Sequence, residues 1–236
     1  MNPPENLYQY TPENAGVYES LGIKDTTYEL GFNEIARLLG DINGKTFLDF
    51  GSGTGRSAEL LKSLGASKVY GADHDKSMIA EAQKKASEGI TFIAMDQTIP
   101  LQDSSVDGAI SANVFIEIRT QGQMQSVCRE VARVVKPQGA FVVMSTNPEA
   151  FGHDFKNFRY TRPENIKAGD LAVCTVKSKG KTFDIQDTFW DEKTYRAALE
   201  GAGFEIEAVR YPKAEDETKW ETDELRVAPF IVSSRE

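Results

Sequence analysis

A run of ten residues, Phe47 to Arg56, constrains the fold of this chain more than any other part of its sequence. It reads FLDFGSGTGR: apolar residues interrupted by one acid, followed by three glycines at alternate positions. Glycines let the backbone turn sharply and approach a ligand closely, and the amphipathic segment after them predicts a helix whose N-terminus faces that ligand. A strand, a glycine loop and a helix in this order indicate an α/β sheet.

The spacing of the glycines and the acid beside them predict which ligand fits. In dinucleotide-binding loops the third glycine usually occupies the sixth position of G-x-G-x-x-G, whereas here Gly55 occupies the fifth. Asp49 would also place a carboxylate near the phosphates of a dinucleotide, where like charges repel. The loop therefore favours a zwitterion whose ammonium group Asp49 can bind.

Two more acids end the next two apolar segments. The segment from Val69 to Asp73 reads as a buried strand whose acid lies about 20 residues past the loop, where a ribose diol needs acceptors. The segment from Ile90 to Asp96 reads as a third strand and also ends in an acid. With its three acids at successive strand ends, the chain resembles the class I S-adenosylmethionine-dependent methyltransferases, strongly over residues 28–150.

This resemblance implies S-adenosylmethionine as the cofactor, with S-adenosylhomocysteine as its product. It assigns Asp73 to the ribose, Asp96 to the adenine amino group and Asn113 to the methionine arm. The cofactor-binding residues expected on this basis are Tyr28, Asp49, Gly51, Ser52, Gly53, Gly55, Asp73, His74, Met78, Asp96, Gln97 and Asn113. Purely structural roles stay open as alternatives, because an acid at a strand end can simply be solvated and a methionine in a helix can belong to the core.

The family's fold is a doubly wound, Rossmann-like α/β sheet of seven strands in the order 3-2-1-4-5-7-6, with strand 7 antiparallel. Apolar strands alternate with helix-period segments here, as such a sheet requires. We expect helices at 57–64, 77–86, 124–135 and 191–199, strands at 108–112 and 140–146, a break at 136–139, and a closing pair of strands at 205–210 and 226–232. Pro229 is a mild objection to the last strand, because proline removes a ladder donor.

We expect residues 1–236 to form a single methyltransferase domain. Residues 1–30 would be a helical lid with Tyr8, Tyr10, Tyr18 and Tyr28, residues 31–146 the cofactor-binding core, residues 147–190 a substrate-side insertion, and residues 191–236 the closing helix and strands. Residues 171–185 alternate around Gly180, which predicts a hairpin in the insertion. An insertion there lies over the carboxyl ends of strands four and five, where open α/β sheets hold their substrates.

Methyl transfer demands little of the protein, since the sulfonium methyl group is already electrophilic and aligning the reactants provides most of the catalysis. A general base is needed only when the nucleophile must lose a proton. The candidates are His153 and Glu117, although His153 also reads as part of a solvated loop and Glu117 as a helix-start acid.

Composition limits the partners. The formal charge of −9 argues against a nonspecific nucleic-acid binder, which needs a basic surface. No signal peptide or membrane-spanning run is evident, and the two distant cysteines suit a reducing compartment, so we expect a cytoplasmic protein. We expect a monomer or homodimer that methylates a nitrogen, oxygen or carbon atom of a small molecule. We expect no nucleic acid, membrane or metal as a partner. The alternatives are an aminopropyltransferase and a noncatalytic S-adenosylmethionine-binding subunit.

Overall fold

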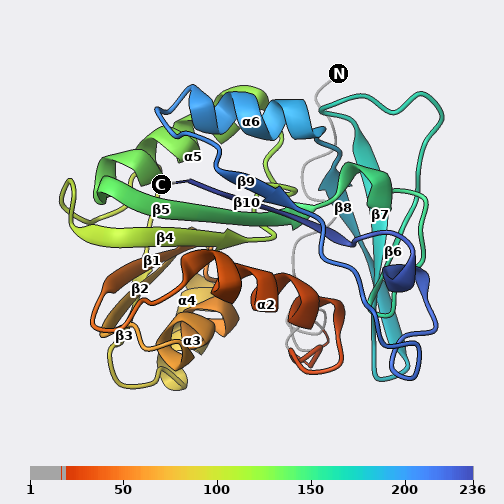
Figure 1. The fold of residues 1–236 in the computed structure, drawn as a ribbon, viewed down its shortest axis with the longest axis horizontal. Coiled ribbons are helices and arrows are strands. Elements are labelled where there is room, and N and C mark those ends of the chain that lie inside the picture. Colours follow the sequence, from red (N-terminus) through yellow and green to blue (C-terminus); the bar gives the residue numbers. More distant parts are fainter. Residues whose placement is uncertain (1–16, 18–19, 236) are drawn as a thin grey trace.

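The computed structural model describes Val17 and residues 20–235 (Figure 1). Tyr8, Tyr10 and Tyr18 of the expected lid therefore lie outside the described residues. The elements, in chain order, are α2 (Thr27–Leu39), β1 (Thr46–Phe50), α3 (Arg56–Ser63), β2 (Lys68–Asp73), α4 (Lys76–Lys84), β3 (Ile90–Ala94), β4 (Val106–Ala112), α5 (Gln121–Val134), β5 (Val135–Thr146), η1 (Pro148–Ala150), β6 (Phe158–Tyr160), β7 (Leu171–Ser178), β8 (Lys181–Thr188), α6 (Glu192–Glu200), β9 (Ala208–Arg210), η2 (Asp223–Leu225) and β10 (Phe230–Ser234).

Seven strands form one sheet in the order β3-β2-β1-β4-β5-β10-β9. The neighbours from β3 to β5 pair in parallel, whereas β10 is antiparallel to both β5 and β9. With β9 and β10 as the sixth and seventh strands, this is the order expected from the sequence. The predicted fold class is confirmed.

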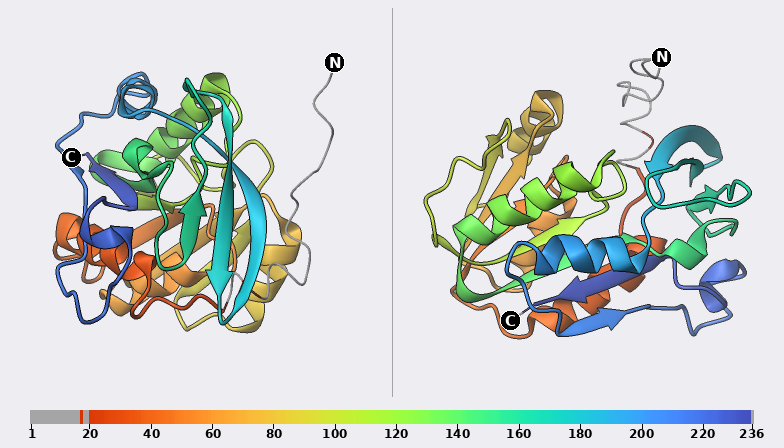
Figure 2. Two further views of the ribbon diagram at one scale, coloured as in Figure 1. Left: turned by 90° about the vertical axis from the view of Figure 1, so that its right-hand side faces the viewer. Right: turned by 90° about the horizontal axis from the view of Figure 1, so that it is seen from above.

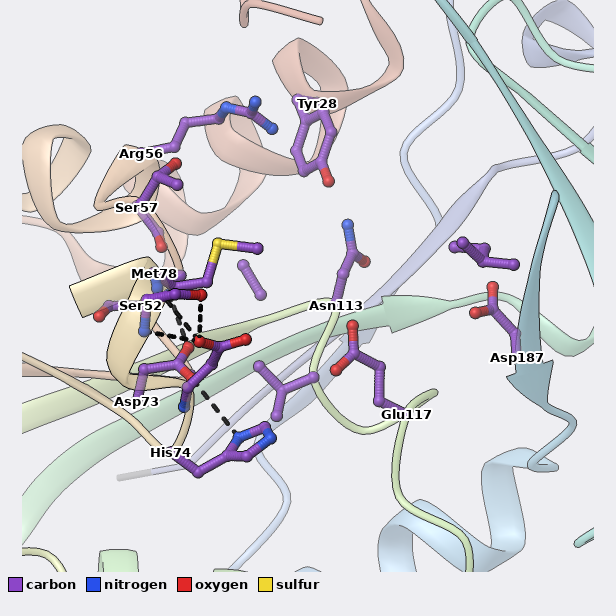
Figure 3. A pocket seen from close by; sticks show the side chains of 18 of the residues that line it. Tyr28, Ser52, Arg56, Ser57, Asp73, His74, Met78, Asn113, Glu117 and Asp187 are labelled. Atoms are coloured by element: carbon purple, nitrogen blue, oxygen red, sulfur yellow. Dashed lines mark hydrogen bonds and ion pairs between the residues drawn. The ribbon is translucent and has the colours of Figure 1, made fainter. Parts of the chain in front are cut away.

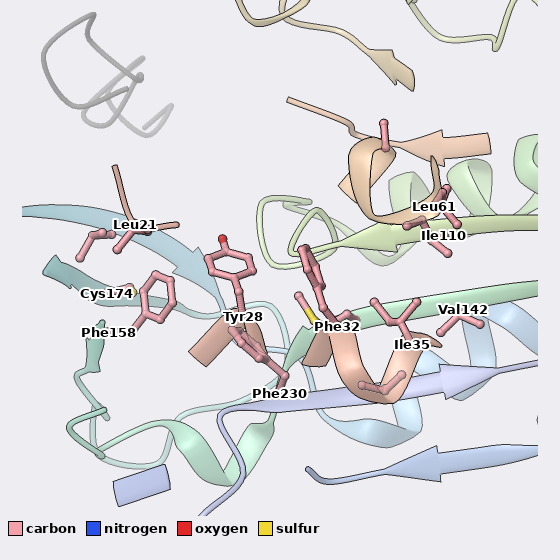
Figure 4. Packing of buried hydrophobic residues seen from close by; sticks show 14 of the residues in the cluster. Leu21, Tyr28, Phe32, Ile35, Leu61, Ile110, Val142, Phe158, Cys174 and Phe230 are labelled. Carbon is pink, nitrogen blue, oxygen red and sulfur yellow. The ribbon is translucent and has the colours of Figure 1, made fainter. Parts of the chain in front are cut away.

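Helices cover both faces of this sheet, with α2, α3 and α4 on one side and α5 and α6 on the other (Figures 1 and 2). Successive residues of β1 face opposite sides of the sheet. Phe47 packs in the hydrophobic cluster beneath α2, α3 and α4, and Leu48 packs in the cluster beneath α5 and α6. In α2, Tyr28, Phe32 and Ile35 form the apolar stripe that packs on the sheet (Figure 4). Among the described helices, none has the length and apolar character that crossing a bilayer requires.

Pro137 and Pro229 both lie outside the regular hydrogen-bonded pairs of the sheet. The break expected at residues 136–139 is wrong as the boundary between helix and strand, because β5 begins at Val135 directly after α5. The pairing with β4 instead jumps from Val106↔Val135 to Gly108↔Ala140, so Pro137 lies in an irregular stretch between the two pairs. Pro229 precedes β10, which starts at Phe230 and not at the expected residue 226.

The predicted hairpin in the insertion is confirmed as β7 and β8, joined by a two-residue turn at Lys179 and Gly180, both with positive φ. A third strand, β6, which the sequence did not predict, pairs with β7. This small sheet lies beyond the carboxyl ends of β4 and β5 (Figure 1). Phe158 and Cys174 belong to the same buried cluster as Tyr28 of α2, so the insertion shares a core with the large sheet.

Close packing of α2 on β5 depends on Gly31. A Cβ atom added to Gly31 would lie 2.1 Å from Met144 Sδ, whose side chain is fully buried. Gly31→Ala should therefore lower the free energy of unfolding by about 1–2 kcal/mol through overpacking, although alanine is the better helix former. Urea unfolding measures this change.

Gly122→Ala in α5 is the matched control. A Cβ atom at Gly122 meets nothing within 4 Å, so this substitution should stabilise the protein by up to about 1 kcal/mol. Equal effects of the two substitutions would contradict the packing argument.

Candidate active site

The glycine loop after β1 is held in place by the end of β2. The amides of Gly51 and Ser52 donate to the carbonyl of Ala72 at 2.7 and 3.1 Å, and the amide of Gly53 donates to Asp73 Oδ2 at 2.8 Å. Gly53 has a φ of +50°, and a Cβ atom there would meet nothing within 4 Å, so its backbone is open to a ligand. A Cβ atom on Gly55 would lie 2.4 Å from the Phe92 ring, which makes Gly55 a packing residue.

Asp49 lies buried beneath the loop. Its Oδ2 accepts a hydrogen bond from Ser57 Oγ at 2.7 Å, while Oδ1 has no partner among the described residues. Burial, together with the negative field of Asp73, raises the pKa of Asp49 to about 7 against the opposing effect of the Ser57 hydrogen bond. The unpartnered oxygen is the kind of acceptor that a ligand's ammonium group satisfies, although Ser57 and not Asp49 itself lines the adjacent cavity.

A cavity of about 530 Å³ extends from the glycine loop to the small sheet, within the usual range for a small-molecule site. The expected residues that line it are Tyr28, Gly51, Ser52, Gly53, Asp73, His74, Met78, Asn113 and Glu117. Figure 3 shows Asp73, His74, Ser52 and Met78 at one end of the cavity and Asn113 and Glu117 further along it.

Asp73 combines two structural hydrogen bonds with its place in the cavity. Besides holding Gly53, it accepts a hydrogen bond from the amide of Asp75 at 2.9 Å through Oδ1. His74 Nδ1 lies 3.4 Å from that same oxygen, with three quarters of the imidazole exposed. Asp75 caps α4 by accepting from the amides of Ser77 and Met78. The carboxylates at this end of the cavity therefore have partners.

Asp96 and Gln97 are exposed and lie outside the described lining of the cavity. Both follow β3, which is the edge strand of the sheet and lies two strands away from β1. Asp49 and Gly55 are the other expected contacts that do not line the cavity. Asp49 instead accepts a hydrogen bond from the Ser57 hydroxyl, and Gly55 packs against the Phe92 ring.

His153, the other candidate base, lies outside this cavity and is paired with an acid. His153 Nδ1 lies 3.0 Å from Asp223 Oδ2, which also accepts a hydrogen bond from the amide of Asp154 at 2.9 Å. Neither His153 nor Asp223 belongs to the described lining of the cavity. The imidazole therefore ties the insertion to η2 and is not placed to act on a substrate there.

Glu117 faces the cavity at the end away from Asp73 (Figure 3). Glu117 is exposed and its side chain opens into the cavity, although protein atoms crowd its carboxyl group and partly desolvate it. This desolvation, followed by the negative fields of Asp187, Asp73 and Asp75, raises the pKa of Glu117 to about 8, and Arg119 opposes the rise. A carboxyl group with such a pKa exchanges its proton near neutral pH, as a general acid or base must.

Asp187 of β8 is a second acid at this end, and the sequence analysis missed it. It is 1% exposed, and neither carboxylate oxygen has a hydrogen-bond partner among the described residues. Burial raises its pKa to about 7, while Arg119 and the nearby Cys174 thiol lower it. Other lining residues that were not anticipated are Phe32, Thr54, Arg56, Ser57, Asp75, Ser77, Ala112, Val114, Arg119, Ile185 and Gln186. Neighbours of the loop were within reach of sequence reasoning, but nothing local marks Asp187.

The family is shown by comparison with known proteins. Residues 48–143 match the model of a methyltransferase domain. A ubiquinone/menaquinone biosynthesis C-methyltransferase of Desulfotalea psychrophila is 32% identical over 175 residues, covering 70% of this chain and 68% of that protein. The chain belongs to the class I S-adenosylmethionine-dependent methyltransferases. This methyltransferase is therefore an enzyme with S-adenosylmethionine as cofactor, as the sequence predicted.

Two further similarities agree with that assignment. An N-demethylindolmycin N-methyltransferase of Streptomyces griseus is 25% identical over 173 residues, or 72% of this methyltransferase and 73% of the relative. The crystal structure of an S-adenosylmethionine-dependent methyltransferase from Mesorhizobium loti superposes with a TM-score of 0.67 at 21% identity, covering 91% of this chain and all of the other. That structure supports the fold alone. No cluster of metal-binding side chains occurs within Val17 and residues 20–235.

The raised pKa of Asp187 predicts a pH-dependent stability. Its pKa in the fold, about 7, lies above its ordinary value of 3.8, so the fold favours the protonated form. The resulting stability is present at low pH and is lost as the pH rises through about 7. Asp187→Asn mimics the protonated carboxyl group and should raise the melting temperature of the ligand-free enzyme more at pH 8 than at pH 5.

Thermal unfolding of the two proteins across this pH range measures the effect. Glu164→Gln removes an exposed acid from the same insertion and should give a difference from the wild type that does not change between pH 5 and 8. A constant difference for Asp187→Asn as well would contradict an ionised, unpartnered Asp187.

Proposed function

We propose that this methyltransferase acts on a small molecule, with the cofactor and the acceptor sharing one cavity. S-adenosylmethionine supplies a sulfonium methyl group that a nucleophile can take. The glycine loop, Asp73 and Met78 would hold the cofactor, and Asn113 would lie beside its methionine arm. The observation that carries the proposal is that the cavity continues from the loop to Ile185, Gln186 and Asp187 of β8, which leaves a second region for an acceptor.

The main contribution of the protein in this proposal is to orient the reactants and exclude water. Tyr28 of α2 is buried against Phe158 of the small sheet, with ring centroids 6.0 Å apart. The guanidinium of Arg56 lies 4.6 Å from the centroid of the same Tyr28 ring. These contacts join the cofactor-binding core to the insertion, so both segments would shape the acceptor region. Glu117 would accept a proton if the nucleophile carries one.

Two alternatives are less well supported. An aminopropyltransferase is disfavoured because the relatives are methyltransferases. A noncatalytic cofactor-binding subunit would need no second region, yet the insertion forms one wall of the cavity. The names of the relatives include both nitrogen and carbon acceptors, so they do not select the nucleophile. A cytoplasmic location and action as a monomer or homodimer, without nucleic acid or membrane, remain our proposals.

Labelled S-adenosylmethionine tests the acceptor class directly. The enzyme is incubated with an extract of the organism that makes it, after ultrafiltration has separated small molecules from macromolecules. We expect label to enter a product in the small-molecule fraction only. Transfer to the macromolecular fraction alone would contradict the proposal.

The ribose assignment predicts a loss of cofactor affinity in Asp73→Ala. Removing a charge-assisted acceptor should weaken the binding of S-adenosylhomocysteine by about 1–3 kcal/mol, or about 5- to 150-fold in Kd. Asp96→Ala removes an acid outside the described lining and should have a smaller effect. Calorimetric titration of the two variants decides the matter, and an equal or larger loss for Asp96→Ala would restore the adenine assignment of Asp96.

A further inference from the structure

The acids at the two ends of the cavity differ in their partners. At the cofactor end, Asp73 and Asp75 accept hydrogen bonds from backbone amides. At the other end, Asp187 is buried with neither oxygen paired among the described residues, and Glu117 stands in the cavity close enough to feel its negative field. Apart from the weakly donating Cys174 thiol, partners are therefore missing at this end of the described lining.

The net charge of the residues described as lining the cavity also indicates that a cation is missing. Four carboxylates, those of Asp73, Asp75, Glu117 and Asp187, face only two guanidinium groups, those of Arg56 and Arg119. S-adenosylmethionine carries one net positive charge, so its binding leaves one negative charge in excess when all four acids are ionised. Asp73 and Asp187 are the buried members of this set, and a buried carboxylate ionises readily only when its charge is compensated. A cation other than the cofactor would supply this compensation.

Arg119 compensates this charge only in part. Its guanidinium donates to Thr188 Oγ1 at 3.1 Å and to the carbonyl of Gln186 at 3.2 Å. Its positive field lowers the pKa values of Glu117 and Asp187, but both remain raised, to about 8 and about 7. The groups facing Asp187 from β6 and β7 are the Tyr160 hydroxyl and the Cys174 thiol, whose pKa values burial raises, so they stay neutral and supply no cation.

A small recess of about 10 Å³ lies beside Asp187 and Glu117. Its apolar walls are Ile116, Phe158 and Ile185, and its other walls are Tyr28, Asn113, Tyr160 and Cys174. It has room for a group the size of one water molecule, which an ammonium group matches. Aromatic and aliphatic walls next to a carboxylate suit an amine with an apolar substituent.

We propose that the acceptor is a basic amine that enters the cavity as its ammonium ion, and that Glu117, with Asp187 behind it, binds this ion and takes its proton. This inference rests on the proposed function and names its substrate class. One N–H bond breaks, the proton goes to the Glu117 carboxylate and the electron pair stays on nitrogen. That pair then forms the N–C bond as the methyl carbon leaves sulfur, and the electrons of the C–S bond remain on sulfur.

A pair of probes that differ mainly in charge tests the binding step without turnover. N-methylbenzylamine is a cation at pH 7, and benzyl methyl ether is its neutral counterpart. Calorimetry with enzyme saturated with S-adenosylhomocysteine should show the amine binding at least about tenfold more tightly than the ether. Glu117→Gln and Asp187→Asn should each lose most of this preference, whereas Glu164→Gln, which alters an exposed acid of the same insertion, should keep it.

The same titrations separate the possible failures. No preference for the amine, or a preference that survives both substitutions, overturns the inference while leaving the proposed function intact. A parallel loss of S-adenosylhomocysteine affinity in Glu117→Gln and Asp187→Asn overturns it too, because the acids would then serve the cofactor's ammonium group. Failure of the wild-type enzyme to bind S-adenosylhomocysteine contradicts the proposed function itself.

Product analysis provides a second, independent readout. The labelled methyl group from the extract experiment should reside on a basic nitrogen. A labelled small molecule methylated on oxygen or carbon would overturn the amine inference and still support methyl transfer to a small molecule.

Discussion

The hydrogen bonds between the glycine loop and the end of β2 are the interaction on which this site depends. Ala72 and Asp73 accept from three consecutive amides of the loop, those of Gly51, Ser52 and Gly53. Because β1 and β2 run in parallel, their carboxyl ends meet at one edge, and the bonds between them set the direction in which α3 begins. Every other part of the cavity is placed relative to this turn.

A second constraint is electrostatic. Asp49, Glu117 and Asp187 all have pKa values raised mainly by desolvation, so the ligand-free site holds carboxyl groups that are costly to ionise. Cationic ligands relieve this cost, since each positive group near a buried carboxylate favours its charged form. The proposed affinity for cations and the predicted pH dependence of stability thus have the same physical origin. Raised pKa values of this kind are also common at functional sites.

The small sheet of β6, β7 and β8 joins one wall of the cavity to the hydrophobic core. Its apolar residues belong to the cluster that contains Tyr28 of α2, and its Asp187 lines the cavity. A wall that packs on the main core is held more rigidly than a free loop, which favours a preorganised acceptor site. His153 contributes to the same rigidity by linking the insertion to Asp223 of η2.

The sequence by itself determined the family and the sheet order, and it predicted most of the residues at one end of the cavity. Gly53 and Asp73 could be predicted because a glycine loop and an acid at a strand end are local patterns with a fixed relation to a parallel sheet. Only the tertiary structure decided that Asp96 lies at the margin of the sheet and that His153 is paired with Asp223. It also brought Asp187 to the cavity that Glu117 lines, although the two are 70 residues apart in the chain. The position of Asp187 depends on the register of β8 and on how the small sheet packs against α2, and these long-range contacts leave no periodic trace in the sequence.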